Sequence, residues 1–410
     1  MERPERRRVL QRLDDQGDRA LLVVTLFLCA FGLVMVLSAS QALALLQHAS
    51  PFYYFERQAA WMVLGFAGLV VLRRLGLDRL RDLAPKAAVA VVVLMLVTLI
   101  PHIGVEVNGA RRWLPLGPLG TLQPSEVAKL VLVLYIADWI ERRGDKLRSF
   151  RDGALPFGMI LGGVLFLLLL QKDLGTAVIT AAILLAAFFT GGGRPVHVVL
   201  LIGVLAFGFF IAVLIEPYRA ARLASFANPF ADRLGAGFQA TQGLLALGSG
   251  GFSGVGLGHS MEKYRWLPEA HTDFIFAIVG EETGLVGTTL LLSGFCAFIV
   301  RGYRIAMRAP DRYSLMVASS ITTWIGFQAL LNMATVTDTL PITGVPLPFV
   351  SYGGTAVATT IAAVGVLLGI ATQGVRQGSR QRRMDAALDL GRRDRRAPLS
   401  GARGGAGASR

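Results

Sequence analysis

The chain has 410 residues, of which 53% are hydrophobic and 17% charged, and its mean hydropathy is +0.55. Soluble domains carry about 25% charged residues, so this composition excludes a soluble globular protein and predicts an integral membrane protein. The net charge of +14 would suit a nucleic-acid partner only if the cations were gathered on one surface, and their order along the chain argues against that role.

Ten apolar runs are each long enough to cross about 30 Å of hydrocarbon as a helix. They cover residues 20–42, 58–75, 85–102, 124–140, 154–171, 174–191, 195–216, 274–300, 313–336 and 347–373. The sequence lacks the alternation of a membrane β-barrel. The predicted fold class is therefore an all-α integral membrane protein with about ten transmembrane helices.

The cations follow the positive-inside rule. With the N-terminus placed in the cytoplasm, 31 of the 41 Lys and Arg residues fall on inner segments and 9 on outer loops. The basic charge therefore indicates topology, with both termini cytoplasmic, and we expect no nucleic-acid partner.

Three parts are predicted along the chain. Residues 1–19 form a cytoplasmic N-terminal segment, residues 20–374 a ten-helix membrane domain, and residues 375–410 a basic cytoplasmic tail. The tail lacks a sizeable apolar face and is predicted to be disordered. A large outer loop, 217–273, connects helices 7 and 8, and long ordered loops are usually functional.

The first polar cluster lies in the outer segment that reads NGARRWLPLGPLGTLQPSEVAKL. Arg111, Arg112 and Trp113 suit a diphosphate and a sugar, because guanidinium pairs with phosphate and indole stacks on sugar faces. The alternative is cations and an aromatic residue at the membrane interface. Glu126 and Lys129 are three residues apart, so they share a helix face and can pair.

Two further features have open interpretations. Asp173, in QKDLGTA, either caps the sixth helix or binds a cation. The run GSGGFSGVGLG, residues 248–258, is either a backbone nest for phosphate or a flexible turn.

The stretch LPEAHTDFIFAIVGEETG carries acids into an apolar run. Asp273 at its threshold either caps the helix or acts as a base at the outer membrane edge, and the two roles are compatible. Lys263, Arg265 and His271 precede it and could bind an anionic group. Two carboxylates lie deeper, Glu281 and Glu282, and are either functional or a structural pair.

The last polar motif is PITGVPLPFVSYGGT, at the entrance of the tenth span. Its polar residues, which include Ser351 and Tyr352, suggest a helix entry that lines a cavity. No His and Cys residues have zinc-site spacing.

Four motifs in order, NGARRWLPLG…QPSEVAKL, DLGTA, LPEAHTDFIFAIVGEETGLVG and PLPFVSYGGT, resemble the SEDS family (shape, elongation, division, sporulation). This family comprises the lipid II-polymerising peptidoglycan glycosyltransferases that include FtsW and RodA. The resemblance covers about residues 20 to 373, and its details are closer to FtsW, the division type. It implies a multi-pass protein of the bacterial cytoplasmic membrane.

The resemblance implies a mechanism. Asp273 matches the family's essential acid, the general base for the acceptor GlcNAc 4-hydroxyl, and undecaprenyl diphosphate is the leaving group. Arg112, Trp113 and Lys129 match the family pattern. Arg111, Lys263 and Arg265 are added from charge and position, and Glu269, four residues before Asp273, could support Asp273 or a metal.

The family resemblance also implies a cofactor and partners. The expected cofactor is a divalent cation, Mg or Mn, whose ligands are unknown, and no organic cofactor is expected. The expected partners are lipid II, the undecaprenyl-diphosphate-linked glycan, a class B penicillin-binding protein transpeptidase and other division or elongation membrane proteins.

One position departs from the family. Lys172 replaces the proline of the usual QPDLGTA motif, so the expected bend and the direction of Asp173 are in question. Two other functions remain as alternatives: a flippase that moves the lipid-linked precursor, and a non-catalytic division scaffold.

Overall fold

The computed structural model describes residues 4–48, 50–107, 109–117, 120–215, 237–264 and 266–394, with residues 223, 225, 226, 229, 230 and 235. Its helices are α1 (Pro4–His48), α2 (Tyr53–Leu75), α3 (Leu77–Thr98), α4 (Pro124–Arg143), α5 (Leu155–Leu170), α6 (Leu174–Thr190), α7 (Pro195–Ile215), α9 (Phe238–Ser249), α10 (Ile275–Met307), α11 (Arg312–Val336) and α12 (Gly354–Asp394), with a 3₁₀ turn η2 (Gly144–Arg148) and a π turn η3 (Phe150–Ala154). The strands are β1 (Val105–Val107), β2 (Ala110–Pro115) and β3 (Thr121–Leu122). A helix overlaps each of the ten predicted spans, and the all-α membrane fold class is confirmed.

Seven of the described helices are long and apolar enough to cross a membrane: α1, α2, α5 with the preceding turn η3, α7, α10, α11 and α12. The apolar helix α6 is shorter, with 17 residues. Helices α3 and α4 also lie on predicted spans, but each carries several charged residues. The ten crossings therefore stay a prediction, while a multi-pass arrangement is established.

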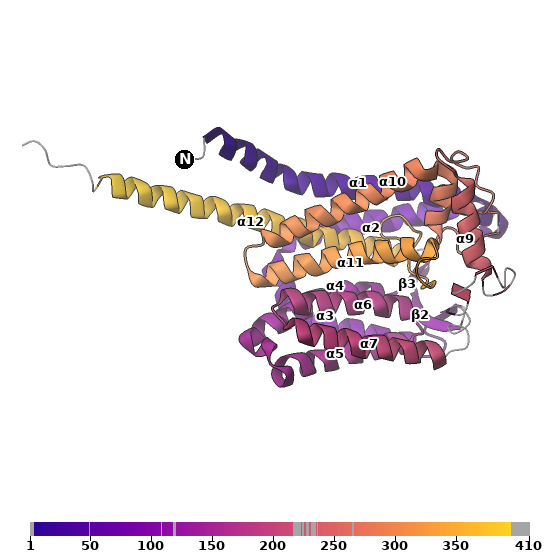
Figure 1. Cartoon of the computed structure of the whole chain (residues 1–410), viewed down its shortest axis with the longest axis horizontal. Coiled ribbons are helices and arrows are strands. Elements are labelled where there is room, and N and C mark those ends of the chain that lie inside the picture. The colour runs from indigo at the N-terminus through magenta and orange to yellow at the C-terminus, as the bar shows by residue number, and fades with distance from the viewer. Residues whose placement is uncertain are drawn as a thin grey trace, which may run out of the picture.

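The helices form one bundle whose two ends differ (Figure 1). Helix α2 packs on α12, α10 on α11, α11 on α6 and α3 on α4. The start of α1 and the end of α12 leave the bundle at one end, whereas β2, β3 and α9 lie at the other. The two described ends of the chain therefore share one side.

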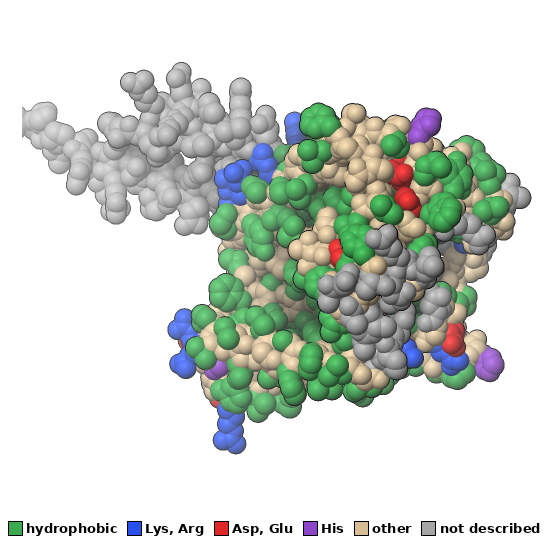
Figure 2. All heavy atoms as spheres, turned by 45° about the vertical axis from the view of Figure 1, so that its right-hand side comes forward, with side chains coloured by type: hydrophobic (Ala, Val, Ile, Leu, Met, Phe, Trp, Pro, Cys, Tyr) green, Lys and Arg blue, Asp and Glu red, His purple; other side chains and the backbone are tan. Residues whose placement is uncertain are grey.

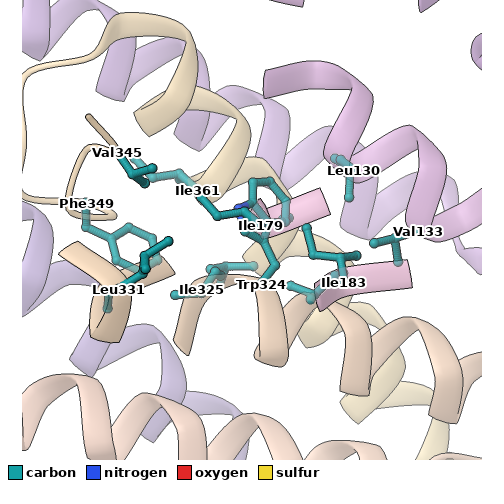
Figure 3. Close-up of a cluster of buried hydrophobic side chains, with 14 of the residues drawn as sticks. Leu130, Val133, Ile179, Ile183, Trp324, Ile325, Leu331, Val345, Phe349 and Ile361 are labelled. Atoms are coloured by element: carbon teal, nitrogen blue, oxygen red, sulfur yellow. The ribbon is translucent and has the colours of Figure 1, made fainter. Parts of the chain in front are cut away.

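Helix α11 lies in the middle of the hydrophobic core (Figure 3). Its Trp324 and Ile325 are fully buried among side chains of α4, α6, α12 and the segment before α12. Phe349 and Val345 come from that last segment, which has no regular secondary structure over residues 341–347. The core thus fixes α11 and this irregular segment against each other.

The surface distinguishes the two ends of the bundle further (Figure 2). Lys and Arg side chains are most prominent on the side from which α12 leaves, with a few on the opposite side, and hydrophobic side chains are spread over the face between them. The same face is hollowed, and hydrophobic side chains line the hollow. Helix α7 contributes strongly to the apolar surface, because none of its apolar stretch is buried.

Segment 103–123, predicted to be an outer loop, contains regular secondary structure. It forms a three-stranded antiparallel sheet in the order β1-β2-β3. Gly109 (φ +72°) lies between β1 and β2, and Gly117 and Gly120 (φ +59° and +92°) lie between β2 and β3. Glycine accepts these left-handed conformations readily, so the connections can turn back within a few residues.

Helices extend into both terminal segments. Helix α1 begins at Pro4, within the predicted N-terminal segment, and α12 continues to Asp394, within the tail predicted to be disordered. The tail residues up to Asp394 include many Arg, Ala, Leu and Gln, which are strong helix formers. Residues 395–410 lie outside the described part.

Helix α10 is broken at Gly284, where φ is +63° and ψ is −159°. The backbone of residues 251–256 supplies the missing partners. Val255 N–H donates to Glu281 O at 2.9 Å, and Leu285 N–H donates to Gly251 O at 3.0 Å. Unpaired backbone groups at membrane depth cost several kcal/mol each, so the glycine run is a backbone partner of α10 and not a free turn.

A first prediction concerns this break. A methyl group at Gly284 would lie 2.4 Å from Gly254 N, and the positive φ disfavours any side chain. We expect Gly284→Ala to lower the free energy of unfolding by about 2–4 kcal/mol, measured by thermal unfolding in detergent. Gly163→Ala on α5 is the control, because a methyl there meets nothing within 4 Å. Equal unfolding temperatures for the two variants would contradict the account of the break.

Candidate functional site

Asp273 is the last polar residue of a tight turn that leads into α10. Glu269 adopts a left-handed conformation with φ +55°, and its carbonyl accepts from Thr272 N–H at 3.1 Å and Phe274 N–H at 3.2 Å. The N-cap of α10 is Phe274, and no side chain caps it. The predicted capping role of Asp273 is therefore wrong, because the turn places its carboxylate one residue too early.

The irregular segment 341–353 holds this turn in place. Ser351 Oγ donates to Thr272 O at 2.6 Å, and Tyr352 N–H donates to His271 O at 2.9 Å. Asn332 on α11 donates to Asp273 O at 2.7 Å. The carbonyl groups of residues 271–273 thus all accept hydrogen bonds from other parts of the bundle. The backbone that carries the Asp273 carboxylate is therefore fixed.

The carboxylate of Asp273 lies against Gly344. A methyl group built on Gly344 would lie 3.2 Å from Asp273 Oδ2, and Gly344 has φ +68°. Asp273 is half-buried. It therefore combines a fixed backbone with partial access from outside, which a group that accepts a proton from a substrate requires.

An aromatic cluster lies beside Asp273. The rings of Tyr54 and His271 are 4.8 Å apart, and those of Tyr54 and Tyr352 are 5.0 Å apart. Burial lowers the pKa of His271, and the carboxylate of Glu269 opposes that shift. His271 is therefore packed within this aromatic cluster. Glu269 is exposed and accepts from Thr272 Oγ1 at 2.7 Å.

A second cluster forms around Asp173, and both interpretations of this residue are correct. Its Oδ1 accepts from Thr176 N–H at 3.2 Å as the N-cap of α6, and the same atom lies 3.2 Å from Arg112 Nη1. Gln123 Nε2 donates to Asp173 Oδ2 at 2.9 Å. The guanidinium carbon of Arg112 lies 4.5 Å from the ring centroid of Trp113. Strand β2 thus presents an Arg–Trp pair anchored on α6.

Arg111 belongs to a different environment. Alternate residues of a strand point to opposite faces, and Arg111 Nη2 lies 2.8 Å from Glu106 Oε2, its neighbour across the β1–β2 pair. The Arg111 side chain is 36% exposed and that of Glu106 49% exposed. The structure therefore separates Arg111 from the Arg112–Asp173 cluster.

Segment 341–355 brings the Asp173 and Asp273 clusters together. A methyl group on Gly175, at the start of α6, would lie 2.6 Å from Thr343 O. The next residue, Gly344, lies against Asp273. Thr355 Oγ1 accepts from Gln123 N–H at 3.1 Å. The starts of α6 and α10 therefore both lie against one short irregular segment.

Lys129 is buried inside the bundle. Its Nζ lies 2.8 Å from Glu126 Oε2 and donates to Gln328 Oε1 at 3.0 Å, and its side chain is 1% exposed. The predicted Glu126–Lys129 contact is present. All the contacts of Lys129 described here are within the protein, so its position suits support of α11 better than direct contact with a substrate.

This ion pair gives a second prediction. Breaking a buried pair leaves an uncompensated charge and costs about 3–5 kcal/mol. We expect Lys129→Met to lower the unfolding temperature in detergent strongly, and Glu126→Gln with Lys129→Met to recover a large part of the loss. A single variant as stable as the unchanged protein would contradict the pairing.

Glu281 and Glu282 form a structural cluster, as one of the two interpretations proposed. Ser38 Oγ donates to Glu282 at 2.7 Å, and Lys263 Nζ lies 3.3 Å from Glu282 Oε1. Met261 N–H donates to Glu281 Oε1 at 2.8 Å. Lys263 therefore joins the loop before α10 to α10 itself. Arg265 lies outside the described residues.

The chain turns at Lys172, between α5 and α6, without the proline that is usual in the family. Lys172 has φ +57°, and its N–H donates to Leu169 O at 3.0 Å while Asp173 N–H donates to Leu168 O at 3.0 Å. This is a Schellman motif with Lys172 at the left-handed position. The chain therefore turns here by helix capping, without a proline ring.

A third prediction follows for Lys172. Proline is locked near φ −65° and has no N–H, so Lys172→Pro should lower the free energy of unfolding by about 2 kcal/mol or more. Lys172→Gly should be tolerated, because glycine adopts positive φ readily. Thermal unfolding of both proteins is the measurement, and a stable proline variant would show that this turn is held differently.

Several residues of the site were not predicted. Gln58, Gln328 and Asn332 are buried polar residues of helices, and each bonds to the backbone of segment 341–353. The sequence does contain a signal for two of them, because Gln328 and Asn332 lie four residues apart inside an apolar run. Polar side chains in membrane helices usually face the bundle interior.

Metal binding has weak support from the protein alone. Within the described part of the chain, no group of three or more His, Cys, Asp or Glu side chains could hold a metal ion. The two site carboxylates, Asp173 and Asp273, belong to separate clusters. A metal cage built only from these residues does not fit the structure.

Comparison with known proteins identifies relatives over most of the chain. The family model FTSW_RODA_SPOVE, cell cycle protein, matches residues 19–375. The probable peptidoglycan glycosyltransferase FtsW of Geobacter metallireducens is 38% identical over 360 residues, 88% of this chain and 96% of that protein. The corresponding protein of Thioalkalivibrio sulfidiphilus is 40% identical over 90% of this chain and 92% of its own length.

Two solved structures share the fold. A chain from "Structural coordination of polymerization and crosslinking by a peptidoglycan synthase complex" has a TM-score of 0.71 and 29% identity, over 86% of this chain and 97% of that one. The rod shape determining protein RodA of Thermus thermophilus has a TM-score of 0.63 and 29% identity, over 86% of this chain and 95% of that one.

Proposed function

The chain belongs to the FtsW, RodA and SpoVE family of cell cycle proteins, and from this premise we propose how its structure catalyses glycosyl transfer. It is a peptidoglycan glycosyltransferase of cell division. We propose that it polymerises lipid II at the outer face of the bacterial cytoplasmic membrane. The observation that carries this proposal is the half-buried carboxylate of Asp273, held against Gly344 on a fixed turn.

Asp273 acts as the general base. Its carboxylate takes the proton of the acceptor GlcNAc 4-hydroxyl, and the oxygen attacks the anomeric carbon of the donor MurNAc. The bond from that carbon to the diphosphate breaks, undecaprenyl diphosphate leaves with the bonding electrons, and the configuration inverts. Proton transfer by a positioned side chain contributes about 10²–10⁴-fold to such a step.

The Arg112–Trp113 pair is proposed to hold the leaving diphosphate and the adjoining sugar. Arg112 is a quarter exposed, and its Nε has no hydrogen-bond partner within the described residues. Negative charge grows on the diphosphate as the bond breaks, so a fixed cation there stabilises the transition state more than the ground state. The hydrophobic hollow in Figure 2 suits the polyprenyl chain.

The remaining predicted residues have supporting roles in this proposal. Lys129 with Glu126, and Lys263 with Glu281 and Glu282, hold helices and the outer loop in position. Ser351 and Tyr352 hold the turn that carries Asp273. Direct substrate contact is proposed only for Asp273, Arg112 and Trp113.

A divalent cation remains a proposal that is separate from this mechanism. Mg²⁺ in proteins is often bound by one or two carboxylates together with substrate phosphates, so a diphosphate substrate could supply most of its ligands. Polymerisation rates with Mg²⁺, with Mn²⁺ and with a chelator test this requirement.

Topology and partner are proposed on two observations. Both described ends of the chain lie on the side where Lys and Arg are most prominent, away from β2, β3 and α9 (Figures 1 and 2). By the positive-inside rule, this supports our proposal that both termini are cytoplasmic and that Asp273 lies outside. The structural match to a chain of a peptidoglycan synthase complex supports a class B penicillin-binding protein as the partner that crosslinks the new strands.

A fourth prediction tests the base. Full-length protein, with its transpeptidase partner when required, receives labelled lipid II in detergent, and glycan strands are measured. We expect Asp273→Asn to lower the rate by about 10²–10⁴-fold, since the amide keeps the size but cannot take the proton. Asp338→Asn is the control, because it makes the same change just beyond α11.

The outcomes separate the alternatives. Undiminished polymerisation by Asp273→Asn rejects Asp273 as the base. Lipid II movement across vesicle membranes without polymerisation by the unchanged protein favours a flippase. Neither polymerisation nor lipid movement, with the transpeptidase partner still bound, favours a scaffold.

A further inference from the structure

Helix α11 carries a buried polar stripe through the hydrophobic core. Trp324, Gln328 and Asn332 follow at intervals of four residues and are 0%, 1% and 1% exposed. Residues four apart lie on the same helix face. This face is directed at the irregular segment 341–353, because Gln328 Nε2 donates to Pro346 O and Asn332 Nδ2 to Val345 O, at 2.8 and 2.7 Å.

Asn332 bonds to two backbone segments at once. Its Nδ2 donates to Asp273 O and to Val345 O, each at 2.7 Å. An amide nitrogen has two hydrogens, so both are used. The opposite orientation of the amide would place its oxygen against two carbonyl oxygens, which fixes the assignment of nitrogen and oxygen.

The two acceptors flank the proposed base. One is the carbonyl of Asp273 itself, and the other belongs to Val345, which follows Gly344. The carboxylate of Asp273 lies against Gly344. One side chain therefore sets the separation between the backbone that carries the carboxylate and the backbone that the carboxylate touches.

Further hydrogen bonds fix the part of α11 that carries Asn332. One helical turn before it, Gln328 Oε1 accepts from Trp324 Nε1 at 2.8 Å and from Lys129 Nζ at 3.0 Å. Lys129 is paired with Glu126 on α4. These bonds tie α4, α11 and segment 341–353 together just below Asn332, so the amide cannot shift without moving the core.

We propose that Asn332 is a positioning residue for Asp273, which orients the general base through two backbone hydrogen bonds without touching the substrate. The inference rests on the proposed function, in which Asp273 takes the proton of the acceptor hydroxyl. A displacement of about 1 Å at a reacting group can cost about 10²-fold in rate. Loss of Asn332 therefore acts on the chemical step and leaves substrate binding largely in place.

The test uses full-length protein and three variants. Asn332→Leu removes both donors at similar volume, and Asn332→Ser keeps one hydroxyl donor. Ser319→Ala is the matched control, since Ser319 is 2% exposed on the same helix and bonds to Thr190 Oγ1 of α6 at 3.2 Å. For each protein the folded fraction, the unfolding temperature, and kcat and KM for lipid II polymerisation are measured.

We expect Asn332→Leu to lower kcat per folded protein by about 10–100-fold, with KM changed by less than about threefold. The kcat of Asn332→Ser should lie between that of Asn332→Leu and that of the unchanged protein. If Asn332→Leu does not fold, the kcat of Asn332→Ser is the deciding measurement. Ser319→Ala should lower the unfolding temperature while kcat stays unchanged. Adding Asn332→Leu to Asp273→Asn should cause little further loss, because both act on one proton transfer.

Other results would overturn the inference. An unchanged kcat with a lower unfolding temperature would make Asn332 purely structural, and a raised KM with unchanged kcat would make it a binding residue. A full additional loss in the Asp273→Asn background would show independent action. An active Asp273→Asn protein overturns the proposed function as well, whereas an inactive one beside fully active Asn332 variants overturns this inference alone.

Discussion

The hydrogen-bonding needs of one irregular segment organise the site. Segment 341–353 has little regular structure, and its three prolines have no N–H group, so its carbonyl groups outnumber its N–H groups and few of them are paired within a helix or sheet. In a bundle where water is scarce, those carbonyls need donors from neighbouring helices. Gln58, Gln328 and Asn332 supply them, at distances of 3.0, 2.8 and 2.7 Å. The donors that satisfy the segment also fix the turn that carries Asp273.

The buried ion pairs also hold separate parts of the structure together. Lys129 with Glu126, and Lys263 with Glu282, are pairs whose side chains are almost entirely inside the protein. Buried pairs are weak evidence of a large stability gain, since desolvation offsets their attraction. Their geometric effect is clearer here. One connects α4 to α11 through Gln328, and the other joins the loop before α10 to α10 itself.

The sequence predicted the local parts of this arrangement. The Glu126–Lys129 pair follows from spacing on one helix, and Asp173 follows from its place before an apolar run. The resemblance to a known family selected Asp273, Arg112 and Trp113. The capping interpretation of Asp273 failed because one residue of backbone geometry decides it: Phe274 occupies the N-cap position of α10.

The contacts that the sequence could not predict join distant segments. Ser38 and Glu282 are 244 residues apart, and Asn332 and Asp273 are 59 apart. A helical pattern shows that such polar residues face inward, but it does not show which partner they meet. The same holds for residues 251–256, whose pairing with α10 depends on the break at Gly284.

The close approach of Gly175 to Thr343 has a mechanical consequence. Even a methyl group at Gly175 would lie 2.6 Å from Thr343 O, so the start of α6 and the irregular segment cannot slide past one another. The same segment touches Asp273 through Gly344. The start of α6, beside Asp173, and the turn that carries Asp273 therefore both lie against one segment, and a displacement of that segment would be transmitted to both carboxylates.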